Sequence, residues 1–193
     1  MMSNQITQTF YAGDTAYDLI GLEEMAVDDV AIKQIGFSTF PAGLFDWQIS
    51  PESCETVWSV VEDDAGNNRL SFRVRAVCQA VHKFAEPDDY RVDDWIGVEN
   101  IINIGFPNDR TKSKKDLADA VGKVRYLAQQ VGVDNTGNLR DIKARLAGVN
   151  FSCPIEHAKM RDGKIFAQWV WSMCVPLNNT EPPLEEMGEE AAD

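Results

Sequence analysis

The sequence predicts a mainly β domain with a helical insert. Three observations support this. Apolar and polar residues alternate in segments between residues 44 and 106, and they alternate again between residues 149 and 175. Between these parts, after residue 113, apolar residues recur every three or four positions, which is the spacing of a helix. The resulting order, β-β-β-α-β-β, is that of a five-stranded OB-like barrel, which leaves one face for oligonucleotides. An α+β sandwich, with the helices on one side of the sheet, is the alternative.

The strands before the insert are predicted from this alternation and from the turn residues between them. The clearest strand covers residues 69–81, in which alternate residues from Leu70 to Cys78 share an apolar face. Arg73 and Arg75 share the opposite face, on which this strand carries no acid. The other segments with the pattern are residues 44–50, residues 56–61, which continue the first strand or begin its partner, and residues 95–106.

The insert is predicted to contain two helices. Apolar residues from Leu117 to Val131 have helical spacing, with Ser113 as the N-cap and Gly132 just after the end. A shorter helix follows and ends before Gly148. After it, residues 149–155 alternate again, the Asp162-Gly163 pair favours a tight hairpin turn, and residues 165–175 form the closing strand.

The charge of the chain is unevenly distributed. The 193 residues carry a net charge of −13, which alone argues against nucleic acid as a partner. Residues 1–32 contain six acids and no base, residues 181–193 also contain six acids and no base, and residues 110–164 carry twelve bases against six acids. We therefore divide the chain into an acidic N-terminal segment (1–36), an OB-like nucleic-acid-binding domain (37–178) and an acidic C-terminal tail (179–193). Both ends are expected to be poorly ordered.

Composition excludes several classes of protein. No apolar run approaches the ~18 residues of a membrane helix, so no membrane partner is expected. The first ten residues lack the basic and apolar regions of a secretory signal. The four cysteines are dispersed and without Cys-x-x-Cys spacing, which indicates free thiols in a reducing compartment. We expect a cytoplasmic protein.

The signatures of an enzyme are missing. His82 and His157 are far apart in the sequence, and neither has the spacing of a metal ligand. The chain contains neither a glycine-rich phosphate loop nor a Gly-x-Ser-x-Gly elbow. Acid pairs such as Asp88-Asp89 fall where loops are expected and are interpreted as solvated. The sequence therefore predicts no catalytic residue, no metal and no cofactor.

Aromatic and basic residues provide the candidate site. Stacking of a base on an aromatic side chain contributes ~1–3 kcal/mol without sequence preference. Trp169 and Trp171 are two residues apart in the last predicted strand and so share one face. Either they form a stacking surface or they belong to the core, and the sequence leaves this choice open.

The residues predicted to contact nucleic acid are of two kinds. Trp47, Trp169 and Trp171 are predicted to stack on bases, and Arg69, Arg73, Arg75, Lys112, Lys114 and Lys115 are predicted to contact phosphates.

Several segments resemble the single-stranded DNA-binding proteins of tailed bacteriophages. They are the strand–helix–strand order with its insert at 117–148, the hairpin at Asp162-Gly163, and the acidic end at 181–193. Phe40-Pro-Ala-Gly43 and the segment 146–151 also resemble phage proteins found in replication and recombination modules. The resemblance implies that the protein protects single-stranded DNA during replication, recombination or repair in the host cytoplasm.

The resemblance also implies that the acidic tail recruits replication or recombination proteins. The tail residues it assigns to partner binding are Leu184, Glu185, Glu186, Met187, Glu189, Glu190 and Asp193. Tails of this kind often end in an aromatic residue, whereas this chain ends in Ala-Ala-Asp.

We therefore expect a non-enzymatic single-stranded DNA-binding protein. The alternative is a protein-interaction or virion-accessory protein whose acidic ends only keep it in solution. An acidic DNA mimic would carry its acids on one folded face, and a nuclease would need a histidine or lysine beside its paired acids. The sequence leaves open whether the protein forms homo-oligomers and whether it prefers DNA or RNA.

Overall fold

The computed structural model describes residues 8–31, 37–38, 40–55, 57–62, 68–86, 89–108, 112–159 and 165–177. The strands in these ranges are β1 (Phe10–Ala12), β2 (Thr15–Tyr17), β3 (Phe37–Ser38), β4 (Gly43–Ile49), β5 (Trp58–Glu62), β6 (Asn68–Phe84), β7 (Glu99–Gly105), β8 (Asn150–Lys159), β9 (Ile165–Trp169) and β10 (Val175–Leu177). The helices are α1 (Leu19–Glu24), α2 (Pro51–Glu55), α3 (Lys114–Gln130) and α4 (Leu139–Leu146), with short 3-10 helices η1 (Val92–Asp94) and η2 (Trp171–Met173). Within the described ranges, no helix is both long and apolar enough to cross a membrane.

Eight of the strands form one sheet in which every described pair is antiparallel. Its order is β3-β9-β8-β4-β6-β5, with β7 beside β6 and β10 beside β8. The long strand β6 organises the sheet, because it pairs with β5, β4 and β7 along its length. Strands β1 and β2 form a separate hairpin.

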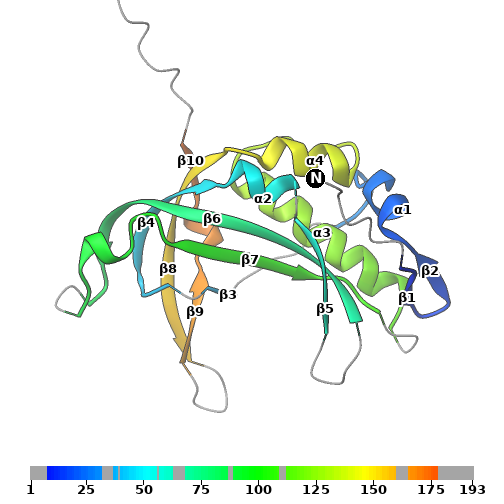
Figure 1. Cartoon of the computed structure of the whole chain (residues 1–193), viewed down its shortest axis with the longest axis horizontal. Helices are drawn as coiled ribbons and strands as arrows, with labels where there is room; N and C mark the ends of the chain where they lie inside the picture. Colours follow the sequence, from blue (N-terminus) through cyan, green and yellow to red (C-terminus); the bar gives the residue numbers. More distant parts are fainter. Residues whose placement is uncertain are drawn as a thin grey trace, which may run out of the picture.

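The core lies between one face of this sheet and the helices. Alternate residues of β4, β6 and β8 point into it, and Trp47, Phe72 and Phe151 are each fully buried. Helix α3 lies along the sheet and adds its apolar side to the same core (Figure 1). The predicted ends of α3 are confirmed: Ser113 and Asp116 form a capping box, and Gly132 follows the helix with φ 80°.

The predicted fold class, mainly β with a helical insert, is confirmed. The closed five-stranded barrel is wrong, because the sheet stays open. Strand β3 lies near β7, yet the described residues of these two strands share no ladder of hydrogen bonds. The apolar face of the sheet is covered by α3 instead, so the core is closed by a helix and not by strand pairing.

The last predicted strand is only partly formed. Residues 160–164, with the predicted Asp-Gly turn, lie outside the described residues, but β8 and β9 pair on either side of them from Lys159 and Ile165 onward. The predicted single strand 165–175 is wrong beyond Trp169. The chain turns through η2 and returns as β10, which pairs with the opposite end of β8.

The acidic N-terminal segment was expected to be poorly ordered, and this is wrong for residues 8–31. Phe10, Leu22 and Val27 are fully buried in the same core as the sheet. The guanidinium of Arg125 on α3 donates hydrogen bonds to the carbonyl oxygens of Asp28 (2.9 Å), Val30 (2.6 Å) and Asn135 (3.1 Å). Buried apolar residues therefore fix a segment that carries six acids and no base.

Candidate nucleic-acid interface

The predicted arginines lie on the face of β6 that points away from the core. Leu70, Phe72 and Val74 are buried, whereas Arg73 and Arg75 are exposed, as the alternation predicts. Residues directly opposite on neighbouring antiparallel strands share a face, so positions of β5 and β7 join this surface. We call it the outer face; its members are Ser59, Val61, Arg69, Ser71, Arg73, Arg75, Val77, Glu99, Ile101 and Asn103.

The outer face contains a notch where the sheet is interrupted. Strand β5 pairs with β6 only as far as Phe72, and β4 pairs with it only from Ala76 onward. Between them the segment around α2 takes over the backbone hydrogen bonds of β6. The Arg73 amide donates to the Val57 carbonyl (2.7 Å), and the Arg75 amide donates to Ser53 Oγ (3.3 Å). A helical turn replaces a strand here and leaves space above the sheet.

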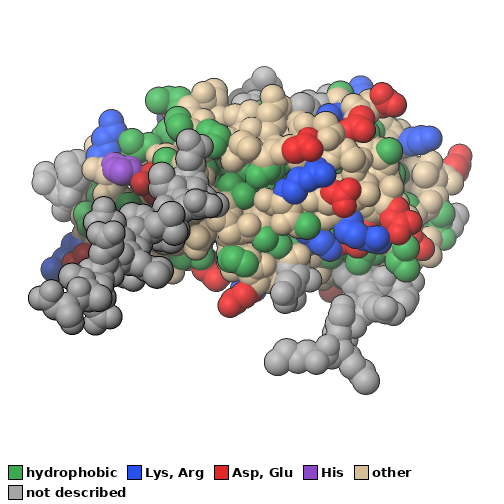
Figure 2. Space-filling view, turned by 90° about the horizontal axis from the view of Figure 1, so that it is seen from above, with side chains coloured by type: hydrophobic (Ala, Val, Ile, Leu, Met, Phe, Trp, Pro, Cys, Tyr) green, Lys and Arg blue, Asp and Glu red, His purple; other side chains and the backbone are tan. Residues whose placement is uncertain are grey.

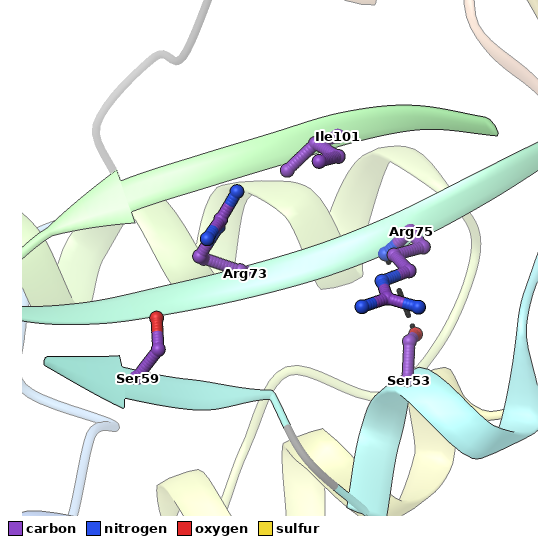
Figure 3. Close-up of a pocket in the computed structure, with 5 residues that line it drawn as sticks. All are labelled: Ser53, Ser59, Arg73, Arg75 and Ile101. Atoms are coloured by element: carbon purple, nitrogen blue, oxygen red, sulfur yellow. Dashed lines mark hydrogen bonds between the residues drawn. The ribbon is translucent and has the colours of Figure 1, made fainter. Parts of the chain in front are cut away.

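This notch is a small cavity of about 100 Å³ lined by Ser53, Ser59, Arg73, Arg75 and Ile101 (Figure 3). The hydroxyl of Ser53 is already used, because it also donates to the Ser50 carbonyl (2.8 Å). The hydroxyl of Ser59 is buried and has no hydrogen-bond partner among the described residues. Sequence reasoning missed both serines. The gap between the predicted strands 44–50 and 56–61, which begins with Pro51, is the signal that marks this region.

The electrostatics of the outer face differ from the prediction in one respect. The β6 face alone carries no acid, but Glu99 on β7 lies beside it, with its Oε2 3.8 Å from Nε of Arg75. Both side chains are about half exposed, so the pair contributes little to stability. No acidic side chain within the described ranges forms an ion pair with Arg73. The described outer-face positions thus hold three arginines and one acid.

The three predicted stacking tryptophans are not on this face. Trp47, Trp169 and Trp171 have exposed fractions of 0%, 4% and 1%, so their prediction as base-stacking residues is wrong and their alternative as core residues holds. The chain leaves the strand at Val170, which lets the rings of Trp169 and Trp171 stack with centroids 5.0 Å apart and planes at 17°. A flat aromatic pair is present, but it packs against Phe151 inside the molecule.

The predicted lysines lie apart from the arginines. Lys112, Lys114 and Lys115 are exposed around the beginning of α3. Because α3 packs against the core face of the sheet, the structure does not bring these lysines together with the outer face. The tail residues predicted to bind partners, Leu184, Glu185, Glu186, Met187, Glu189, Glu190 and Asp193, lie outside the described residues.

Part of the basic second half of the chain is neutralised by the acidic N-terminal segment. Glu23 on α1 forms ion pairs with Lys143 and Arg140 of α4, and Glu24 pairs with Arg140 at 3.0 Å. The side of the molecule seen from above in Figure 2 accordingly shows acidic and basic side chains interspersed. The excess of bases in residues 110–164 therefore gives no continuous basic patch on this side.

Among the described residues, the other chemistry-bearing groups give no second site. His82 Nε2 lies 2.8 Å from Asp46 Oδ2 across β6 and β4, but within the described residues no group of three or more side chains could hold a metal ion. A hydrogen bond with Cys174 and burial raise the pKa of the Cys153 thiol far above its ordinary value, and burial raises the pKa of Cys78 to about 11. These thiols stay protonated at neutral pH and are poor nucleophiles.

Comparison with known proteins finds no family model that matches the chain and no curated protein that matches it. The function therefore has to be argued from the geometry of the outer face.

Proposed function

We propose that this protein binds single-stranded nucleic acid, with single-stranded DNA as the first candidate, through the backbone phosphates. The observation that carries the proposal is the outer face, which holds three arginines and one acid in a chain whose net charge is −13; two of these arginines, Arg73 and Arg75, line the notch. A local excess of positive charge against such a background indicates a surface kept for an anion.

Arg69, Arg73 and Arg75 would follow the phosphates along β6. From Arg69 to Arg75 the strand extends about 20 Å, at ~3.3 Å per residue, which is long enough to contact several phosphates in a row. The tryptophans do not take part, since all three candidates are buried. Binding of this kind depends on charge, so it has little sequence preference and weakens strongly with salt.

On this proposal, the acidic tail competes with the nucleic acid. Residues 181–193 carry six acids and no base, and a segment tethered to the domain reaches an effective concentration in the millimolar range. Nucleic acid would displace the tail and free it to recruit replication or recombination proteins. The resemblance to phage proteins supports placing this role in phage DNA metabolism.

The test is binding of fluorescein-labelled oligo-dT, followed by anisotropy at several salt concentrations. Labelled DNA is required because the buried tryptophans would report little of an event on the outer face. The double variant Arg73→Gln and Arg75→Gln should bind more weakly. Each lost phosphate contact should flatten the slope of log K against log salt by about 0.7.

Arg91→Gln is the matched control, because Arg91 is an exposed arginine before η1 and is not one of the outer-face positions. It removes one charge, as each outer-face substitution does, and should leave the slope unchanged. Equal losses in the control and in the outer-face variants would mean that only net charge matters. No binding of oligo-dT by the intact chain at low salt would refute the proposal.

A chain lacking residues 181–193 should bind more tightly, most clearly at low salt, where screening is weakest.

One observation favours the alternative of a protein-interaction module. Met173, Val175 and Leu177 in η2 and β10 are apolar and have exposed fractions of 64%, 56% and 36%. Such a group on a short strand is suited to contact another protein. If oligo-dT does not bind and the chain instead self-associates in light scattering, with Val175→Asp abolishing the association, the alternative replaces the nucleic-acid proposal.

A further inference from the structure

The notch in the outer face has a more specific chemistry than the surface around it. Its available polar groups can all donate hydrogen bonds: the guanidinium groups of Arg73 and Arg75 and the hydroxyl of Ser59 (Figure 3). A guanidinium stays charged at every physiological pH and cannot accept a hydrogen bond. The lining therefore presents positive charge and hydrogen-bond donors to whatever occupies it.

Ser59 is the least expected member of this lining. Its Oγ is buried without a partner in the described chain, and a buried hydroxyl that makes no hydrogen bond is unfavourable by about 1–3 kcal/mol. Such groups are rare in folded proteins and point to a missing ligand or water. Ser53, on the other side of the notch, is different, because its hydroxyl is fully engaged with Ser50 and the Arg75 amide.

The size of the notch limits what it can hold. About 100 Å³ corresponds to roughly three water volumes, at ~30 Å³ each. Pockets for whole drug-sized ligands are about 300–1,000 Å³, so a nucleoside would have to remain outside. A single tetrahedral group fits both the volume and the set of donors.

We propose that the notch between β5, β6 and α2 binds one phosphate-type oxyanion, held by Arg73, Arg75 and the Ser59 hydroxyl. This inference deepens the proposed function and rests on it for the source of the group. In that setting the oxyanion is a phosphodiester of the nucleic-acid backbone, which would anchor the strand at one point of the outer face. A free phosphate ion has the same chemistry, and the experiment separates the two.

The experiment follows the Nε–H signals of Arg73 and Arg75 by NMR, at constant ionic strength set with chloride. The probes are inorganic phosphate and thymidylyl-thymidine, which has a single phosphodiester; thymidine, which has none, is the blank. Both phosphate probes should shift the two signals in a saturable way, and thymidine should not. Tighter binding of the dinucleotide identifies the backbone as the source, and tighter binding of inorganic phosphate identifies the free ion.

Ser59→Ala is the decisive variant. It should weaken binding of the phosphate probes about ten-fold, the effect of one lost hydrogen bond to a charged group. Its melting temperature in chloride should equal or exceed that of the unmodified chain, because the substitution removes an unpartnered hydroxyl, and phosphate should stabilise it less. Arg91→Gln should bind the probes as the unmodified chain does.

Two results would overturn the inference: no saturable shift with either phosphate probe, or a Ser59→Ala variant that binds them unchanged. These outcomes are distinct from failure of the proposed function. If oligo-dT binds with a salt-dependent affinity that Ser59→Ala does not alter, the anchor is wrong and the proposed function stands. If inorganic phosphate binds in the notch but oligo-dT does not bind, the anchor stands and the proposed function is wrong.

Discussion

The buried side chain of Arg125 offers the sharpest test of how the N-terminal segment is held. Arg125 has an exposed fraction of 9% and joins three backbone carbonyls, two of them in the segment 28–30. Replacing it with methionine keeps a long apolar stem and removes all three donors. The carbonyls of Asp28, Val30 and Asn135 would then lose their guanidinium partner.

The size of the effect follows from these three hydrogen bonds. A hydrogen bond contributes a net ~1 kcal/mol to stability, so the loss of three partly buried ones gives about 3 kcal/mol. That is a large part of the ~5–15 kcal/mol that stabilises a typical domain. In urea, with a slope of about 1–3 kcal/mol per molar, the midpoint should fall by about 1 M or more.

The assay is urea denaturation followed by circular dichroism, combined with limited proteolysis by a glutamate-specific protease. This protease is suitable because residues 1–32 contain no base for trypsin but include Glu23 and Glu24. Arg125→Met should be cleaved there faster than the unmodified chain, and Arg125→Lys should fall between them, since one ammonium lacks the planar fork of a guanidinium. An Arg125→Met variant whose midpoint and cleavage rate match those of the unmodified chain would refute the reasoning.

Three further predictions concern the scaffold. Phe72→Ala should lower the free energy of unfolding by roughly 3–5 kcal/mol in a denaturant titration, because Phe72 is fully buried opposite the arginines; an unchanged midpoint would mean that the faces of β6 are reversed. Gly132→Ala should lower the melting temperature, because Gly132 has φ 80° and a Cβ there would lie 2.5 Å from Cγ of Pro176. Hydrogen bonds from Ser113 lower the pKa of Asp116. The ionised Asp116 carboxylate therefore stabilises the fold fully above the ordinary carboxyl pKa, and this stabilisation is lost as the pH falls through the lowered pKa of Asp116. The variant Asp116→Asn lacks this carboxylate, so between pH 5 and pH 2 it should lose less stability than the unmodified chain.

The elements that sequence analysis predicted well are those with a local signal. The alternation in β6 places Phe72 inside and Arg73 outside whatever the neighbouring strands do, and the spacing from Leu117 to Val131 fixes the buried side of α3. Capping residues are local as well, so the beginning of α3 at Ser113 was also predictable.

The features that were missed depend on contacts between distant segments. The two-residue spacing of Trp169 and Trp171 predicted a shared strand face, but the chain turns at Val170 and the rings enter the core. The notch exists because β4 and β5 stop at different points along β6, and no local pattern reports that. Ser59 became a candidate only when its hydroxyl was found buried without a partner in the described chain.

The docking of the N-terminal segment also has a consequence for synthesis of the protein. Tyr11 and Tyr17 make hydrogen bonds to residues 97 and 90 positions later in the chain, and Glu23 meets Lys143, 120 positions later. At about 5–20 residues per second, the segment waits roughly 5–25 s on the ribosome before its partners are made. During that time its apolar residues face water, and its six acids, with no base among them, repel the same segment of a neighbouring nascent chain. The one-signed charge of this segment thus protects it until it folds.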